Sequence, residues 1–116
     1  MGANDLLPLK HSTYCVLLAL GDDELHGYAI MQELTQMTGG RETILPGTLY
    51  AALARMVDEG LVEVRDSSDD DASGGPKRRY YRRTRLGRAA ARAESERLRV
   101  LLDIARAQKI LDGGRR

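Results

Sequence analysis

Apolar residues recur with the 3.6-residue period of an α-helix in three segments of the first half of the chain. The first predicted helix covers residues 9–20, and Ser12 or Thr13 could cap its start. The second covers residues 26–37 and ends at a pair of glycines. The third begins at Pro46, whose missing N–H costs nothing in a first helical turn. Short helices joined by a tight turn are typical of a helix-turn-helix.

The third predicted helix has an apolar face that we expect to be buried and an opposite face that we expect to be exposed. The residues expected to be buried are Leu49, Leu53, Met56 and Val57. The residues expected to be exposed are Thr48, Ala52, Arg55 and Glu59. Gly60 follows at the position where a left-handed C-terminal cap is favoured.

A β-hairpin is predicted after these helices. Residues 61–66 alternate apolar and polar side chains as a half-buried strand does, and residues 77–84, KRRYYRRT, predict a second strand. The polar, glycine-rich segment between them is typical of a loop, so the two strands should pair. Tyr80 and Tyr81 should then point to opposite faces. The predicted fold is mainly α with a small β-hairpin, which is a winged helix-turn-helix.

The last predicted helix is too long for the rest of the chain to cover. Thr84 can cap it, and it runs to about residue 111, which gives a length of roughly 40 Å. Its second half is broadly apolar and needs a second partner. The chain therefore divides into a DNA-binding domain, residues 1–84, and a dimerisation helix with a short tail, residues 85–116. The predicted dimer contacts are Leu9, Val16, Leu20, Val100, Leu101, Ile104 and Leu111.

Charge changes this picture by suggesting a partner. The net charge is only +1, but residues 1–60 hold three basic and eight acidic residues, whereas residues 61–116 hold fifteen and nine. Between Lys77 and Arg92 there are eight basic residues and no acidic one. Such a basic face is typical of a protein that binds a polyanion. In a winged helix-turn-helix the expected polyanion is double-stranded DNA. A solvated, arginine-rich surface is the alternative.

Several classes of function are disfavoured. No apolar run reaches the length of a membrane span, and the N-terminus lacks the pattern of a signal peptide. A single cysteine, Cys15, suits a reducing cytoplasm and is expected to be an inert core residue. His11, Cys15 and His26 have no metal-ligand spacing, so we expect neither a metal nor another cofactor. No nucleophile is paired with a base, and an enzyme is not expected.

Candidate DNA contacts lie on the second and third helices and on the hairpin. They are Tyr28, Gly47, Thr48, Tyr50, Arg55, Lys77, Arg78 and Arg79. Tyr50 could instead pack at the edge of the core, and Arg55 could be an ordinary surface residue. Tyr28 opens the second helix, whose N-terminus favours a phosphate, but a semi-buried position is the favoured interpretation.

Three segments together carry a resemblance to a known family. LHGYAIMQEL, LPGTLYAALARMVDEGLVE and GGPKRRYYRRTRLGRAA, in this order and spacing, resemble the PadR-family transcriptional regulators, over roughly residues 9–91. The single terminal helix resembles the short subfamily. At matching positions, Thr48 and Tyr50 fall on the recognition helix, and Lys77 and Arg78 fall on the wing. Leu45 stands where the family often has a serine, and Arg83 where an apolar residue is usual.

The resemblance implies a homodimeric repressor that dimerises through its terminal helix and the partner's first helix. Ligands of such regulators are often planar aromatic compounds bound near the dimer interface. We therefore expect a repressor that releases an inverted-repeat operator on binding a small-molecule effector at the dimer interface. With no Trp or Phe in the chain, that site should be lined by aliphatic residues. The alternative is a winged-helix module that binds protein without sequence-specific DNA binding.

Overall fold

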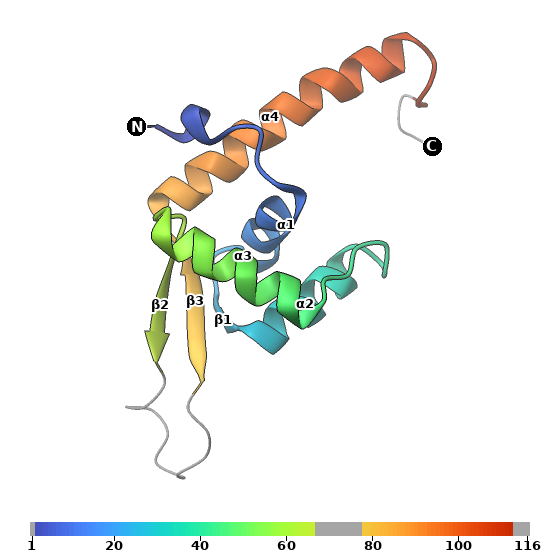
Figure 1. Cartoon of the computed structure of the whole chain (residues 1–116). Coiled ribbons are helices and arrows are strands. Elements are labelled where there is room, and N and C mark those ends of the chain that lie inside the picture. Colours follow the sequence, from blue (N-terminus) through green and yellow to red (C-terminus); the bar gives the residue numbers. More distant parts are fainter. Residues whose placement is uncertain (1, 67–77, 113–116) are drawn as a thin grey trace.

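The chain folds as a winged helix-turn-helix with one long C-terminal helix. The computed structural model describes residues 2–66 and 78–112. The elements in order are η1 (Ala3–Leu6), α1 (His11–Leu20), β1 (Glu24–His26), α2 (Gly27–Met37), α3 (Pro46–Asp58), β2 (Val62–Asp66), β3 (Arg79–Arg83) and α4 (Arg85–Ala107) (Figure 1). The predicted helices and the paired strands are confirmed, whereas η1 and β1 were not predicted.

The ends of the helices follow from local capping. Thr84 caps α4 as predicted, because its hydroxyl accepts the Gly87 N–H at 3.0 Å. The imidazole Nδ1 of His26 caps α2 by accepting the Ala29 N–H at 3.2 Å. The prediction for α1 was wrong, since Lys10 precedes its first turn and Thr13 lies buried within the helix. α4 ends at Ala107 rather than near residue 111.

The core forms around α1, which lies between α4 and the α2–α3 pair (Figure 1). Leu17, Ile30, Leu49, Leu53 and Met56 are fully buried in it. Ala52 is fully buried too, so the prediction that Ala52 is exposed was wrong, whereas Thr48 and Glu59 of the same predicted face are exposed. Alanine fits there because its small side chain lets neighbouring elements approach closely.

Two of the predicted dimer contacts on α1 are part of this core. Val16 and Leu20 have no exposed surface within the single chain. The sequence correctly placed them on the apolar face of a helix, but that face packs against other elements of the same chain. The prediction that they face a second copy was therefore wrong. Leu9 lies just before α1 and is partly buried against the core.

A three-stranded antiparallel sheet has the order β1-β3-β2. Leu25 of β1 and Val64 of β2 both pair with Tyr81 in the central strand. Tyr81 is buried and Tyr80 is half-buried, which confirms that they point to opposite faces. The β2–β3 hairpin is the wing.

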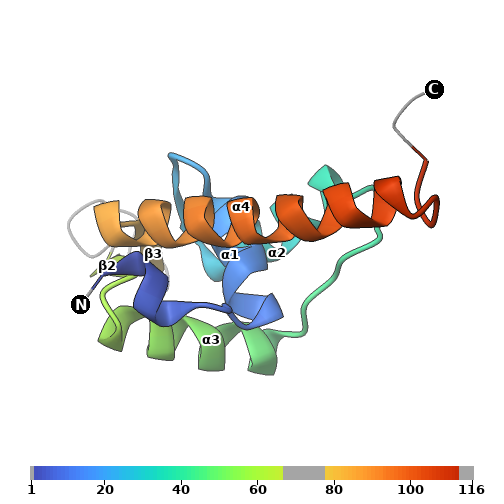
Figure 2. The same ribbon diagram turned by 90° about the horizontal axis from the view of Figure 1, so that it is seen from above.

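α4 has two different halves. Gly87, Ala90, Ala91 and Glu94 in the first half are buried against the rest of the chain. The second half runs away from the helical body, and its C-terminal end reaches past the other helices (Figures 1 and 2). Val100, Leu101, Leu102 and Ile104 are exposed there. Among residues 2–66 and 78–112, no helix has the length and apolar character that crossing a membrane requires.

Candidate nucleic-acid interface

A groove of about 800 Å³ opens between the start of α2, α3 and the wing. We call it the α2–α3–wing groove. Its lining residues are His26, Gly27, Tyr28, Ala29, Gln32, Tyr50, Arg78, Arg79 and Tyr81. Four predicted DNA contacts, Tyr28, Tyr50, Arg78 and Arg79, thus meet on one surface although they are far apart in the sequence.

Tyr50 joins α3 to the start of α2. A methyl group added at Gly27 would overlap the hydroxyl end of the Tyr50 ring, so the ring could keep this position only beside a residue without a side chain. The Tyr50 side chain keeps 48% of its surface exposed toward the groove. Its hydroxyl lies at the positive end of the α2 dipole, where an anion is also favoured.

Tyr28 is on the surface. It is 62% exposed, so the favoured prediction of a semi-buried side chain was wrong. Its position in the first turn of α2 places its face on the solvent side, because the core face of this helix is taken by Ile30 and Leu34. Contact between Tyr28 and DNA stays a prediction.

His26 is a groove residue that the sequence analysis considered only as a possible metal ligand. Its Nδ1 accepts the Ala29 N–H, so the proton of a neutral ring sits on Nε2. Nε2 lies 3.3 Å from Nη1 of Arg78, which is also a donor. The signal that sequence offered was His26 standing directly before a helix.

Several predicted contacts lie outside this groove. Thr48 is exposed, but it lines a different pocket beside the first turn of α1. Gly47 is exposed at the start of α3 and an added Cβ there would meet nothing. Arg55 is half-buried next to Leu9, so the assumption that it lies on an exposed face was wrong. Lys77 lies outside the described residues.

Much of the positive charge on the sheet is paired with acidic residues of the same chain. Arg65 pairs with Glu24 at 2.9 Å, and its hydrogen bonds hold the pKa of Glu24 below the ordinary value. Arg82 pairs with Glu63 at 2.9 Å. The arginines of the wing therefore take two kinds of position: Arg65 and Arg82 pair with acidic residues on other strands, whereas Arg78 and Arg79 line the groove. Arg79 also lies 3.7 Å from the Asp66 carboxylate of β2.

Arg83 has a structural position. Its side chain is only 13% exposed. It donates to the Leu17 carbonyl at 3.2 Å and to the Asp22 carboxylate at 3.1 Å. A cation at the carbonyl end of α1 is stabilised by the helix dipole. An apolar residue at this position would leave that carbonyl without this donor.

A second cluster of polar side chains lies on the other side of α3. His11, Cys15 and Glu42 bring one nitrogen, one sulfur and one oxygen atom within 4.8 Å of one another. Burial, and then the charge of Glu42, raises the pKa of the Cys15 thiol. The analysis of spacing compared His11 and Cys15 with His26 and did not consider Glu42.

Comparisons with known proteins agree with this geometry. Residues 16–93 match the family described as "Transcriptional regulator PadR-like family". The transcriptional regulator Rv3488 of Mycobacterium tuberculosis is 38% identical over 91 residues, which cover 78% of this chain and 76% of that protein. The chain belongs to the PadR-like family. The resemblance seen in the three sequence segments is thereby confirmed, and the chain is a transcriptional regulator of the PadR type.

Solved structures show the same fold. A PadR-family regulator from Clostridium difficile R20291 has a TM-score of 0.70 at 23% identity, over 84% of this chain and 97% of that one. Bacillus subtilis PadR in complex with operator DNA has a TM-score of 0.64 at 21% identity, over 72% of this chain and 47% of that one. Both share the winged helix-turn-helix of this PadR-like chain.

Proposed function

We propose that this PadR-like chain is a homodimeric repressor that binds an inverted-repeat operator. The observation that carries the proposal is the α2–α3–wing groove, in which Tyr28, Tyr50, Arg78 and Arg79 line one surface. Hydroxyl and guanidinium groups are the donors that contact phosphates, and the start of α2 adds its backbone N–H groups. α3 is the helix that enters the major groove, and the wing contacts the adjacent backbone. We also propose that the protein acts in the cytoplasm, as expected from the sequence.

Dimerisation supplies the second half of the site. The exposed apolar residues of α4, Val100, Leu101, Leu102 and Ile104, continue beyond the part of the helix that the core covers. A twofold partner buries them and sets two copies of α3 one DNA turn apart. A small-molecule effector that binds between the copies would alter this spacing and release the operator. Its site would be lined by aliphatic side chains.

Selection of bound duplexes from a random-sequence pool tests the proposal. The expected product is an inverted repeat whose half-sites lie about 10 base pairs apart, centre to centre. A pool that shows no enrichment would contradict sequence-specific binding and favour the protein-interaction module.

A salt titration then tests the groove. Arg78→Ala and Arg79→Ala should each weaken binding to every duplex and lower the salt slope by about one per lost phosphate contact. Arg82→Ala is the matched control and should leave the slope unchanged, because Arg82 is not among the groove-lining residues and pairs closely with Glu63 at 2.9 Å. Equal effects of all three variants would mean that the wing does not use its groove side on DNA.

A further inference from the structure

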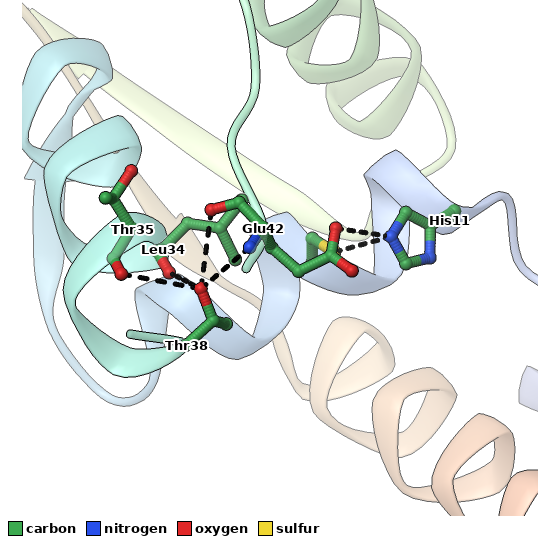
Figure 3. Close-up of polar contacts among 6 residues, drawn as sticks. His11, Leu34, Thr35, Thr38 and Glu42 are labelled. Carbon is green, nitrogen blue, oxygen red and sulfur yellow. Dashed lines mark hydrogen bonds and ion pairs between the residues drawn. The ribbon is translucent and has the colours of Figure 1, made fainter. Parts of the chain in front are cut away.

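We propose that His11, Cys15 and Glu42 bind a divalent metal ion of the zinc class. His11 and Cys15 are four residues apart on α1 and so lie on one face of that helix. Glu42 reaches them from the connection between α2 and α3 (Figure 3). The three side chains thus come from two segments that the fold brings together.

The distances suit one ion between the three ligand atoms. Nε2 of His11 lies 2.8 Å from Oε1 of Glu42 and 3.5 Å from Sγ of Cys15. Bond lengths of about 2.0–2.3 Å place the ligand atoms of a tetrahedral zinc ion roughly 3.3–3.7 Å apart. All three ligand atoms lie within 4.8 Å of one another. To bind one ion, the partly exposed Glu42 carboxylate would move away from the imidazole by about half an ångström and toward the Cys15 thiol by up to about one ångström.

The donor set selects the kind of metal. One imidazole, one thiolate and one carboxylate suit zinc and cobalt, whereas a thiolate disfavours magnesium and calcium. The thiol of Cys15 loses its proton when a metal binds it, whatever its pKa in the free protein. His11 is exposed, and the pocket beside the cluster has a volume of about 290 Å³. A water molecule can therefore occupy the fourth coordination position of the ion.

The position of Glu42 is fixed by a hydrogen bond between its backbone N–H and the side chain of Thr38. The Thr38 hydroxyl donates to the Leu34 carbonyl at 2.9 Å and accepts the Glu42 N–H at 3.0 Å (Figure 3). This turn fixes the start of the connection to α3 and directs the Glu42 carboxylate toward His11. The bond is to the backbone of Glu42, so it positions the carboxylate without contacting it.

The cluster is placed where it can influence DNA binding. Glu42 precedes Pro46, the first residue of α3, by four positions. Leu45 and Thr48, at the start of α3, line the same pocket as the three ligands. A bound ion ties α1 to the connection that holds the recognition helix, so metal would change how firmly α3 is set for DNA. This regulatory step rests on the proposed function, whereas the metal site does not.

Cobalt titration of the full chain without an affinity tag tests the site. One Co²⁺ per chain should give the intense visible bands of a tetrahedral site and a thiolate-to-metal charge-transfer band. Zn²⁺ should displace the cobalt. Cys15→Ser should abolish the charge-transfer band, and His11→Gln and Glu42→Gln should each weaken the affinity at least tenfold.

Controls separate ligand loss from unfolding. His11 is exposed and Glu42 partly so, and the helical circular dichroism of both variants should match that of the wild type without metal. Glu33→Gln removes an exposed carboxylate from α2 and should bind cobalt as the wild type does. Thr38→Val should weaken binding while keeping the charge-transfer band. Absence of binding at micromolar Co²⁺ and Zn²⁺, or binding that survives all three ligand substitutions, would overturn the assignment and leave an ion pair between His11 and Glu42.

Operator affinity measured with and without zinc tests the regulatory step. Zinc should change the affinity of the wild type at least threefold and leave that of Glu42→Gln unchanged. An unchanged wild-type affinity would overturn regulation through this site. A chain that binds cobalt as described but selects no operator would instead contradict the proposed function alone.

Discussion

The phenol ring of Tyr50 occupies the space that a side chain at Gly27 would need, so α3 contacts the first residue of α2 directly. This contact couples the two helices of the helix-turn-helix at the point where both face the α2–α3–wing groove. Because Gly27 has no side chain, the Tyr50 hydroxyl can approach the N-terminus of α2. The geometry of the proposed DNA surface therefore depends on Gly27, although Gly27 has no side chain with which to contact DNA.

Gly27→Ala should destabilise the chain and weaken operator binding. The added methyl group must displace the end of the half-exposed Tyr50 ring, so the cost should fall at or below the lower end of the about 1–3 kcal/mol that overpacking costs in a core. Without the clash, alanine in a helix would be favoured over glycine by roughly 0.5–1 kcal/mol. Urea denaturation at fixed protein concentration measures the change in the free energy of unfolding.

A double-mutant cycle identifies the cause. In a Tyr50→Ala background the space is open, so Gly27→Ala should become neutral or stabilising. An equal cost in both backgrounds would show that the clash with Tyr50 does not determine the effect.

Arg83→Met should lower the free energy of unfolding by about 1–3 kcal/mol, since the Leu17 carbonyl loses a charged donor. Methionine keeps the apolar stem of the side chain, so packing changes little. Arg82→Met on the same strand is the control, and little change is expected because Arg82 and Glu63 are both exposed. If the two variants unfold at the same urea concentration, the buried contacts of Arg83 do not stabilise the fold.

The sequence predicted those parts of the fold that have a local cause. The helices have a clear apolar period, and Thr84 and Pro46 mark two of their starts. β1 has only three residues, too few for a period, and it exists because β3 offers an edge to pair with. Likewise, the burial of Ala52 and the partners of Arg83 depend on elements distant in the sequence.

The candidate sites divide in the same way. The groove residues Tyr28, Tyr50, Arg78 and Arg79 were found because helix starts and basic strands have recognisable patterns. Glu42 was missed, because its proximity to His11 across 31 positions is a product of tertiary packing. A search for ligand spacing along one segment cannot detect a site shared by two.

Glu94 should make stability depend on pH in the acid range. The pKa of its carboxyl is lowered, first by the hydrogen bond from Arg97 and also by the Leu9 N–H at 3.1 Å. This stabilisation is fully present above the ordinary glutamate pKa of about 4.3 and is lost as the pH falls through the lower folded value. Glu94→Gln should therefore cost about 1–2 kcal/mol at pH 7, and this cost should shrink progressively as the pH falls from about 4.3 through the lowered pKa of the folded protein.

The control for this pH dependence is Glu96→Gln, two residues further along α4. The Glu96 side chain is half-exposed and pairs with Arg99, whereas that of Glu94 is only 4% exposed. Urea denaturation from pH 7 to pH 3 compares the three proteins. Parallel curves for the wild type and Glu94→Gln would show that this buried carboxylate is not responsible for the acid sensitivity.

Ile104→Asp should convert the proposed dimer into monomers and abolish operator binding together with dimerisation. Leaving the exposed apolar surface of α4 in water forfeits about 25 cal/mol for each Å² that a partner would cover. Val16 and Leu20 are occupied in the core, so the partner's α1 would contribute surface residues such as Leu18. Met37→Asp is the control, because Met37 is 50% exposed and Ile104 is 48% exposed, but Met37 lies at the end of α2. Light scattering of the wild type decides the premise, since a monomer at micromolar concentration contradicts both the dimer and the inverted-repeat operator.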